Sequence, residues 1–355
     1  MGDMKRAGTE PVLSVRGLKL HYFTSKGAVR AVDGISFDLY PGETLGLVGE
    51  SGCGKTSAGY ALLGMASPPG RIVEGSILVD GTEVVGMPER SLRRDLRWSK
   101  ISMVFQGAMN CLTPVYTIRE LMAETYREHA PARTRDAVAR GDGGIDALLA
   151  ESLRLVGLPV AALGRYPHEL SGGMKQRVAI AMALFLEPRV VVMDEPTTAL
   201  DVIVQAQILN LVKGLKRDLG LSCVFITHDL ATEAEIADRI LVMYAGKMAE
   251  LGSSEDIFGN DPLTGSQRPL TGSLHPYTQM LLASTPRLHR RVSELAFIPG
   301  SPPDLIDPPE GCRFAPRCPF AKAKCHRDEP PIAELGHRHL AACWKAMEDP
   351  EYERL

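Results

Sequence analysis

One short segment, residues 49–56, has residue types at the spacing that binds phosphate. It reads Gly-Glu-Ser-Gly-Cys-Gly-Lys-Thr and satisfies the pattern G-x-x-x-x-G-K-[ST], between an apolar run at 44–48 and a helix-forming run at 58–63. The glycines let backbone N–H groups point at phosphates, Lys55 adds a cation, and the Thr56 hydroxyl can bind magnesium. The sequence therefore predicts a nucleoside triphosphate site made of Gly49, Glu50, Ser51, Gly52, Cys53, Gly54, Lys55, Thr56 and Ser57.

Two adjacent carboxylates, Asp194 and Glu195, follow the apolar run at residues 190–193. At the end of a buried strand, Asp194 can hold the magnesium shell while Glu195 faces the attacking water as general base. Lys55 and magnesium would stabilise the charge on the transferring phosphate. Taken alone, the pair could be a solvated strand end before a turn at Pro196. Beside a phosphate loop, catalysis of hydrolysis is the favoured interpretation.

These groups need a scaffold that brings strand ends together, and the apolar pattern predicts one. Apolar and polar residues alternate at 35–39, so the first hundred or so residues are expected to be rich in antiparallel strands. Four other apolar runs lack this alternation, which is typical of strands covered on both faces in a parallel sheet. These runs are residues 44–48, 190–193, 223–226 and 240–243.

Helices are predicted between these strands. An apolar stripe after Asp201 predicts a helix that ends at Gly220. Between residues 106 and 171 no strand pattern is convincing, whereas residues 145–156 read as an amphipathic helix, so we predict a helical insertion here. Two segments of low apolar content are predicted to be surface loops or disordered: residues 127–144 and 259–273.

The composition argues against several classes of protein. The chain has 355 residues, 45% of them hydrophobic, which is enough for a core and about two domains. Its formal net charge of −3 gives no general electrostatic reason to bind nucleic acid. No apolar run approaches the roughly 20 residues of a membrane-crossing helix, and residues 1–10 lack the apolar centre of a secretory signal. We expect the protein to stay in the cytosol.

The turn formed by Ser171, Gly172 and Gly173, ahead of the acidic strand, resembles the signature of the ABC ATPase family. The resemblance implies a P-loop NTPase of α/β class with the ABC ATPase fold, in which a parallel-sheet core carries an antiparallel β subdomain and a helical insertion. It also implies that this turn meets the γ-phosphate of a nucleotide held by a partner subunit, at the positive end of a helix. Standing alone, Ser171 would be an ordinary helix cap.

Four more positions resemble motifs of that family in order and spacing. Gln106 is similar to its glutamine loop, which touches magnesium and the attacking water and relays nucleotide state to the membrane subunit. Asp201 is similar to its aspartate loop, which crosses the dimer interface. His228 and Tyr22 are similar to the histidine on the γ-phosphate and the aromatic ring on adenine. Singly, such a histidine or tyrosine is more often a packed or surface residue.

Later segments narrow the branch. Residues 275–282, 298–303 and 312–319 resemble the ATPases of dipeptide, oligopeptide and nickel importers, and residues 196–199 resemble the first of their two paired ATPases. The resemblance implies a heterodimer with a second homologous ATPase, two membrane permease subunits and an extracytoplasmic solute-binding protein. It places the chain peripherally at the cytoplasmic face of the cell membrane. Residues 107–111 depart from the family's usual Asp-Pro-Met run, which bears on the contact with a membrane subunit.

Peptides are the expected cargo, and nickel or another small solute is the alternative. Two rival functions differ in kind. A non-transport ABC ATPase acting on nucleic acid or ribosomes would be expected to have tandem cassettes or long coiled coils, and the sequence has one cassette. A purely regulatory nucleotide-binding module would lack Glu195 or His228, and both are present.

Four of the seven cysteines crowd into the C-terminal region: Cys312, Cys318, Cys325 and Cys343. In a reducing compartment such a group favours a metal over disulfides, and the spacing differs from the short knuckles of common zinc sites. Four thiolates can hold an iron–sulfur cluster, and the resembling importer subunits include proteins with a [4Fe–4S] cluster at this segment. Zinc and unliganded thiols remain alternatives. Nearby histidines that could replace a thiolate are His326, His337 and His339.

The predicted organisation has four parts. They are an N-terminal tail at residues 1–11, a nucleotide-binding domain at 12–258 with a helical subdomain at about 107–185, a connecting segment at 259–298, and a small cysteine-containing C-terminal lobe at 299–355. The lobe is rich in proline and poor in apolar residues, so we expect its ligands, and not a hydrophobic core, to hold it together.

Overall fold

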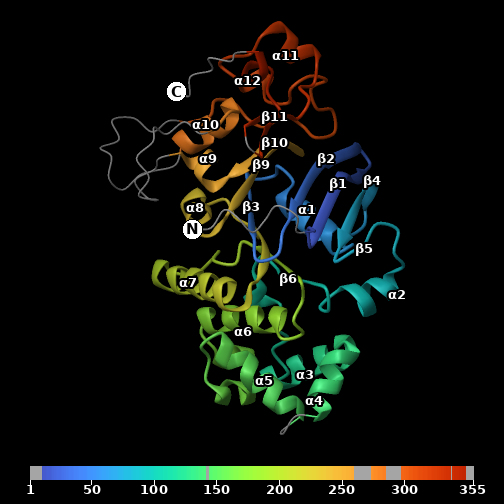
Figure 1. The fold of residues 1–355 in the computed structure, drawn as a ribbon, viewed down its shortest axis with the longest axis vertical. Helices are drawn as coiled ribbons and strands as arrows, with labels where there is room; N and C mark the ends of the chain where they lie inside the picture. Colours follow the sequence, from blue (N-terminus) through green and yellow to red (C-terminus); the bar gives the residue numbers. More distant parts are fainter. Residues whose placement is uncertain (1–9, 141–143, 260–272, 285–296, 337, 349–355) are drawn as a thin grey trace.

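The computed structural model describes residues 10–140, 144–259, 273–284, 297–336 and 338–348. In this part of the chain two β-sheets lie side by side, with a group of helices at one end and the C-terminal residues at the other (Figure 1). The predicted site residues follow the strands of the larger sheet, so the order of its strands decides which of them meet.

The smaller sheet is antiparallel, with strand order β2-β1-β4-β5. Leu18 on β1 lies opposite Ile35 on β2, and both side chains are fully buried. This sheet confirms the prediction of an antiparallel, β-rich start. Its strands are β1 (Leu13–Thr24), β2 (Gly27–Leu39), β4 (Gly70–Val79) and β5 (Thr82–Glu83).

The larger sheet has the order β11-β12-β10-β9-β3-β8-β7-β6. Its strands are β3 (Thr44–Val48), β6 (Ile101–Val104), β7 (Val190–Asp194), β8 (Ser222–Ile226), β9 (Arg239–Tyr244), β10 (Lys247–Ser253), β11 (Ala333–Gly336) and β12 (His339–Ala341). The five strands β9, β3, β8, β7 and β6 are parallel, and every residue of β3, β7 and β8 is buried, as their unbroken apolar runs predict. Parallel strands end at one edge, so the residues after β3, β7 and β8 lie together.

Helices flank the sheets and form the end of the molecule drawn at the bottom of Figure 1. They are α1 (Lys55–Leu62), α2 (Glu89–Ser91), α3 (Ile118–His129), α4 (Ala132–Arg140), α5 (Gly144–Leu155), α6 (Gly172–Leu184), α7 (Val202–Leu219), α8 (Leu230–Ile236), α9 (Ser254–Phe258), α10 (Pro276–Ala283), α11 (Ala323–Arg327) and α12 (Trp344–Glu348), with a π-helix at Leu92–Leu96. Single 3-10 turns lie at Ala108–Asn110, Val160–Gly164, Pro167–Glu169 and Ala315–Arg317.

Two sequence predictions about helices have opposite outcomes. Helix α7 begins after the Asp201 cap and ends at Gly220, which adopts the left-handed conformation, so this prediction is confirmed. The prediction of a loop at residues 127–144 is wrong, because α3 continues to His129 and α4 occupies most of the remainder. Alanine and arginine make up most of α4, and both favour a helix without needing an apolar stripe. The other predicted loop lies mainly at residues 260–272, outside the described residues.

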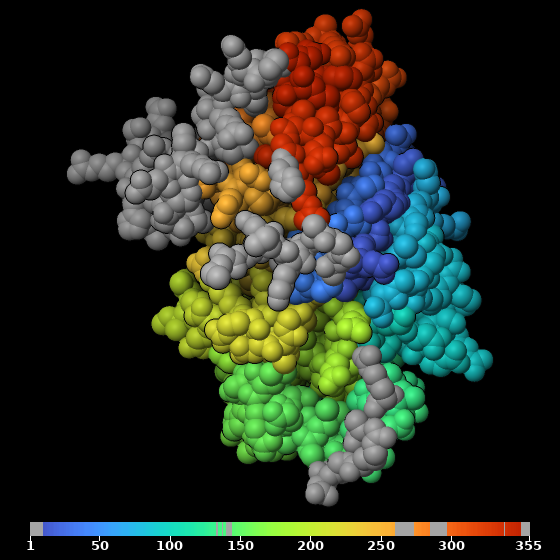
Figure 2. All heavy atoms as spheres, viewed as in Figure 1, coloured from blue at the N-terminus to red at the C-terminus, as the bar shows by residue number. Residues whose placement is uncertain are grey.

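The described residues of the predicted C-terminal lobe, 299–336 and 338–348, pack against the rest of the fold. Strand β12 pairs with β10, so the lobe extends the larger sheet. Phe314 is fully buried against Tyr244 and Tyr277. The space-filling view shows the described C-terminal residues packed directly against the N-terminal strands (Figure 2). The expectation that the lobe lacks a hydrophobic core is therefore wrong, since the pattern along the sequence does not reveal that core residues come from distant segments.

Candidate active site

The phosphate-binding segment lies between β3 and α1, as the motif requires. Gly54 directly precedes α1 with φ of 106°, and a Cβ atom there would lie 2.0 Å from the carbonyl oxygen of Ala31. Only glycine fits this conformation and this close approach. The Lys55 Nζ donates to the carbonyl oxygens of Gly49 at 2.7 Å and Glu50 at 3.1 Å. The ammonium therefore lies against the backbone of the loop, at the start of a helix whose N–H groups favour an anion.

Thr56 and Asp194 meet beside this loop. The Thr56 hydroxyl donates to Oδ1 of Asp194 at 3.2 Å. Oδ2 of Asp194 is buried and has no hydrogen-bond partner within the described residues. Burial raises the pKa of Asp194 to about 6, although the bond from Thr56 acts in the opposite direction. A buried carboxylate oxygen without a donor, next to a hydroxyl, suits a divalent cation with oxygen ligands.

Glu195 is contacted by two side chains from distant parts of the sequence and by one from its own segment. Its carboxylate accepts hydrogen bonds from Gln106 Nε2 at 2.9 Å and Thr198 Oγ1 at 2.9 Å, and His228 Nδ1 lies 3.0 Å away. Its backbone has φ of 47° and its N–H donates to the carbonyl of Ile226 on β8. A glutamate held in this rarely adopted conformation is typical of a functional site.

The electrostatics of Glu195 favour its charged form. Burial alone would raise its pKa, but the hydrogen bonds from His228 and Thr198 outweigh burial and leave the pKa below its usual range. An ionised carboxylate at the edge where β3, β7 and β8 end can accept a proton from a water molecule. The arrangement can therefore support hydrolysis of a phosphoanhydride bound at the loop.

Comparisons with known proteins agree with this geometry. Residues 32–198 match the family model described as "ABC transporter", and residues 264–325 match the model for the oligopeptide/dipeptide transporter C-terminal region. The dipeptide transport ATP-binding protein DppD of Bacillus subtilis is 42% identical over 338 residues, covering 94% of this chain and 95% of that protein. The oligopeptide transport ATP-binding protein OppD of Escherichia coli is 41% identical over 340 residues, covering 96% and 95%. This chain is an ABC ATPase.

Solved structures support the same fold. The CbiO1 subunit of Clostridium perfringens, part of the ABC transporter complex CbiONQ, is 26% identical with a TM-score of 0.58, covering 70% of this chain and 91% of that one. The dimeric ABC transporter cassette MJ0796 gives a TM-score of 0.59 at 24% identity, over 68% and 98% of the two chains, and so bears on the fold alone. The predicted fold class is confirmed, with the P-loop α/β core, the antiparallel sheet and the helical region between β6 and β7.

The signature turn of this ABC ATPase does not join its own phosphate loop. Ser171 caps α6, where its hydroxyl accepts from the N–H of Met174 at 3.3 Å. Asp201 caps α7 in the same way, accepting from Val204 at 3.0 Å. Gly173 packs against Val204, where a Cβ would approach to 2.6 Å. Both polar side chains serve their own helix termini, so the described chain does not by itself bring them to residues 49–56.

Tyr22 lies beside the segment that follows the loop. Its hydroxyl is 3.2 Å from Oγ of Ser57, and its ring packs on the smaller sheet. The side chain is half-buried, which leaves part of the ring available to a flat ligand. The structure thus places Tyr22 near α1.

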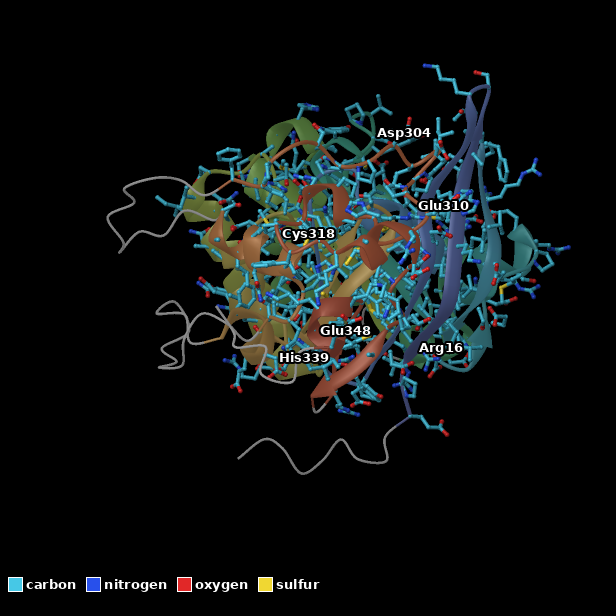
Figure 3. All side chains as sticks on the ribbon, turned by 90° about the horizontal axis from the view of Figure 1, so that it is seen from above. Arg16, Asp304, Glu310, Cys318, His339 and Glu348 are labelled. Carbon is cyan, nitrogen blue, oxygen red and sulfur yellow. The ribbon has the colours of Figure 1, made fainter. Side chains whose placement is uncertain are left out.

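The four C-terminal cysteines line one small cavity of about 20 Å³. Figure 3 looks down on this end of the molecule, with Cys318 and His339 labelled. Burial raises the pKa of Cys312 to about 12, and repulsion from the other three thiols adds to the shift. Within the described residues, no group of three or more His, Cys, Asp or Glu side chains is placed to hold a metal ion. His339 instead contacts Glu250 at 2.7 Å, and His337 lies outside the described residues.

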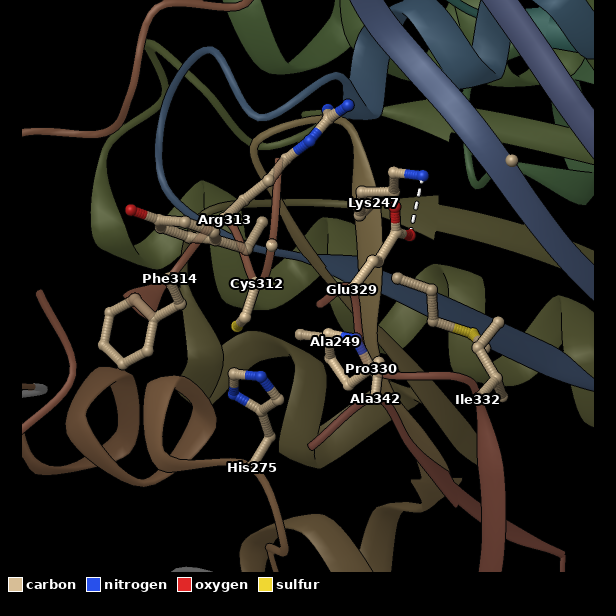
Figure 4. Close-up of a pocket in the computed structure, with 14 residues that line it drawn as sticks. Lys247, Ala249, His275, Cys312, Arg313, Phe314, Glu329, Pro330, Ile332 and Ala342 are labelled. Atoms are coloured by element: carbon tan, nitrogen blue, oxygen red, sulfur yellow. Dashed lines mark ion pairs between the residues drawn. The ribbon is translucent and has the colours of Figure 1, made fainter. Parts of the chain in front are cut away.

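Several contacts of the site have no counterpart in the sequence motifs. Thr198 donates to Glu195, and Tyr277 and Arg317 contact Glu50 of the phosphate loop. A second cavity, of about 70 Å³, is lined by residues of β10 and of the C-terminal segment, and Lys247 pairs with Glu329 there at 2.8 Å (Figure 4). Among the described residues no helix is both long and apolar enough to cross a membrane.

Proposed function

We propose that this ABC ATPase hydrolyses ATP to drive the import of dipeptides or oligopeptides through separate membrane subunits. The observation that carries the proposal is the convergence of Gln106, Thr198 and His228 on Glu195, beside a phosphate loop. The two curated relatives named above are dipeptide and oligopeptide transport proteins aligned over nearly their whole length. The match of residues 264–325 to the oligopeptide/dipeptide transporter region supports the same cargo. Nickel or another small solute is the alternative.

In this mechanism each residue of the site has a distinct role. Glu195 is the general base that takes a proton from the attacking water, and Gln106 and His228 orient it. Lys55 and the N–H groups of residues 51–56 bind the outer phosphates. Magnesium, held by Thr56 and Asp194 with Gln106 nearby, would supply a counter-charge to the phosphate oxygens. The buried, unpartnered Oδ2 of Asp194 supports this assignment.

The complete site requires a second ATPase subunit. Ser171, Gly172, Gly173 and Asp201 would contact the nucleotide bound by that partner, because within the described part of this chain the polar side chains of Ser171 and Asp201 only cap their own helices. Two apolar side chains next to Asp201, Val202 and Ile203, are 79% and 73% exposed, which supports their burial in such an interface. We propose that the partner is a homologous ATPase and that the pair is a heterodimer.

Coupling to the membrane would use the surface after Gln106. Val115 and Tyr116 are 69% and 48% exposed, and they follow the segment 107–111 that comes directly after Gln106. Two permease subunits would dock here, on the cytoplasmic face of the membrane, and an extracytoplasmic binding protein would deliver the peptide. ATP binding and hydrolysis would then drive alternating access in the permeases.

We also propose that Cys312, Cys318, Cys325 and Cys343 hold a [4Fe–4S] cluster with a structural role. All four line one cavity, and all are free of disulfides. Four cysteine thiolates are the ligand set that holds such a cluster. Zinc bound by the same thiolates is the alternative.

The decisive experiment for the function uses Glu195→Gln in the transporter reconstituted with its partner subunits in vesicles. We expect ATP to bind with unchanged affinity while ATP turnover and uptake of labelled peptide fall by about a hundredfold or more, because the amide cannot accept the proton. Glu151→Gln, an exposed change on α5, is the matched control and should have no effect. Normal turnover in Glu195→Gln would contradict the proposed base, and uptake of nickel without peptide would replace the cargo.

A further inference from the structure

A single residue of the phosphate loop, Glu50, is held from outside the cassette core by two C-terminal side chains. Its backbone N–H donates to the hydroxyl of Tyr277 on α10 at 2.8 Å. Its carboxylate accepts two bonds from the Arg317 guanidinium, at 2.6 Å to Oε2 and 3.0 Å to Oε1. Arg317 and Glu50 are 267 residues apart in the sequence. The loop that bends around phosphate is thus fixed at its outer side by the C-terminal part of the chain.

Arg317 is itself rigidly placed. Its Nε donates to the carbonyl of Pro299 at 2.8 Å, and its other nitrogens reach the Tyr244 hydroxyl at 3.1 Å and the carbonyl of Ile298 at 3.3 Å. The side chain is only 5% exposed. A planar guanidinium whose nitrogens are occupied on several sides presents its remaining donors to Glu50 in one orientation. This is unlike a mobile surface ion pair, which contributes little.

Tyr277 is equally constrained. It is fully buried and packs against Tyr244, at 4.6 Å between ring centroids, and against Phe314, at 5.3 Å. Phe314 lies between Cys312 and Arg317 in the sequence. The two side chains that hold Glu50 therefore stand on one packed unit, and this unit includes the cysteine-bearing segment.

A second buried arginine, Arg313, joins the lobe to the rest of the fold without contacting the phosphate loop, and so provides a comparison for Arg317. Arg313 donates to Asp33 on β2 and to the carbonyl of Ala245, and neither belongs to the phosphate loop. Its side chain is as buried as that of Arg317. Figure 4 labels Arg313 beside Cys312 and Phe314. The ion pair of Arg313 with Asp33 attaches the lobe to β2, whereas the ion pair of Arg317 with Glu50 contacts the loop that binds ATP.

We propose that Arg317 is a positioning residue for ATP binding: through Glu50 it holds residues 49–56 in the conformation that accepts the phosphates. The C-terminal lobe thereby acts on nucleotide affinity, and Cys318, the next residue, links the contents of the cysteine cavity to the loop. The proposal rests on ATP binding at this loop and is independent of the cargo. Glu195 remains the residue of the chemical step.

The test measures Mg-ATP affinity and steady-state kinetics of the full chain with its partner subunits. Arg317→Gln should weaken ATP binding about tenfold and raise KM while changing kcat little, because binding and not the general base is disturbed. Arg317→Lys, which keeps the charge but not the two-pronged geometry, should show a smaller loss. Glu50→Gln should resemble Arg317→Gln, and the double variant should be no weaker than either single one.

Arg313→Gln is the matched control, with less than about a twofold change in ATP affinity expected for a change that contacts no residue of the loop. Hydrogen exchange at residues 49–54 should accelerate in Arg317→Gln and stay unchanged in Arg313→Gln. Unaltered ATP affinity in Arg317→Gln, or equal losses in both arginine variants, would overturn the proposal. If Arg317→Gln does not fold, Glu50→Gln decides, and wild-type affinity in that variant overturns it. None of these results alters the test of Glu195.

Discussion

The nucleotide site and the C-terminal lobe hold their polar groups in different ways. In the nucleotide site the polar groups lie at strand ends or helix starts: Thr56 lies in the first turn of α1, Asp194 ends β7 and Ser171 caps α6. In the lobe the polar groups are placed by partners far away in the sequence, such as Asp33 for Arg313. Local backbone geometry places most groups of the first region, with Glu50, which is held by Arg317, as an exception. The second region depends on tertiary contacts and, we propose, on a bound cluster.

The difference in how the residues are placed predicts a difference in how much stability each substitution removes. A residue set by its own helix or strand loses one interaction when it is changed. When a residue that binds a shared metal group is replaced, the protein loses the group and also the contacts between the chain segments that the group holds together. Three measurements of the free energy of unfolding test this comparison, from the largest expected change to the smallest.

The largest change is expected at the cysteine cavity. Anaerobically purified protein should contain about four iron atoms per chain and show a broad visible absorbance. Cys343→Ser should lose the iron and lower the free energy of unfolding on the order of 5 kcal/mol, because the cluster supplies folding free energy directly. Cys343 is buried in the cavity, whereas Cys111 is exposed elsewhere, so Cys111→Ser is the control and should keep both iron and stability.

Other outcomes of that experiment would change the comparison. Zinc without iron would keep the structural role and replace the cluster. Protein that contains neither metal, and whose free energy of unfolding is unchanged by Cys343→Ser, would show that the thiols are unliganded and that the hydrophobic contacts of Phe314 suffice.

The sequence predicted the nucleotide site more completely than the C-terminal lobe, because the two regions differ in how far apart their interacting residues lie along the chain. The loop at 49–56, the carboxylates Asp194 and Glu195 and the end of α7 at Gly220 are encoded within a few neighbouring residues, and the structure places them at the predicted elements. The pairing of β12 with β10 and the contact of Arg317 with Glu50 depend on residues far apart, which no local period reveals. Four cysteines indicate a metal, but their spacing along the chain does not identify it.

A buried acid on α8 lies against β3, the strand that leads into the phosphate loop. Glu233 on α8 is fully buried, and neither of its carboxylate oxygens has a hydrogen-bond partner within the described residues. It packs on β3, where a Cβ at Gly46 would lie 2.3 Å from its Oε2. Burial, with repulsion from Asp229, raises the pKa of Glu233 well above its usual value. The folded protein therefore holds a proton that the unfolded chain releases.

This proton gives the second prediction, an intermediate effect that depends on pH. Because the folded pKa is the higher one, stability falls as pH rises from the unfolded pKa toward the folded pKa, by about 1.4 kcal/mol per unit of separation. Glu233→Gln keeps the shape without the titration. It should match the wild type near pH ~4.5 and become progressively more stable than the wild type as pH rises toward ~7, as measured by urea unfolding across that range.

An exposed neighbour provides the control for this pH effect. Glu235, two residues further along α8, pairs with Lys213 at the surface, so Glu235→Gln should leave the pH profile unchanged. Parallel pH profiles for the wild type and Glu233→Gln would mean that Glu233 is ionised in the fold, and the prediction would then be wrong.

The smallest expected change compares two helix caps, of which only one is proposed to face a partner subunit. Ser171 caps α6 and Thr117 caps α3, each accepting a hydrogen bond from a backbone N–H at 3.3 Å. Replacing either by alanine should lower the free energy of unfolding by about 1 kcal/mol, the usual contribution of such a cap. If Ser171 also meets the partner's nucleotide, only Ser171→Ala should lower ATP turnover in the assembled transporter. Equal turnover in the two variants would mean that Ser171 acts only as the cap of α6 and does not contact the partner's nucleotide.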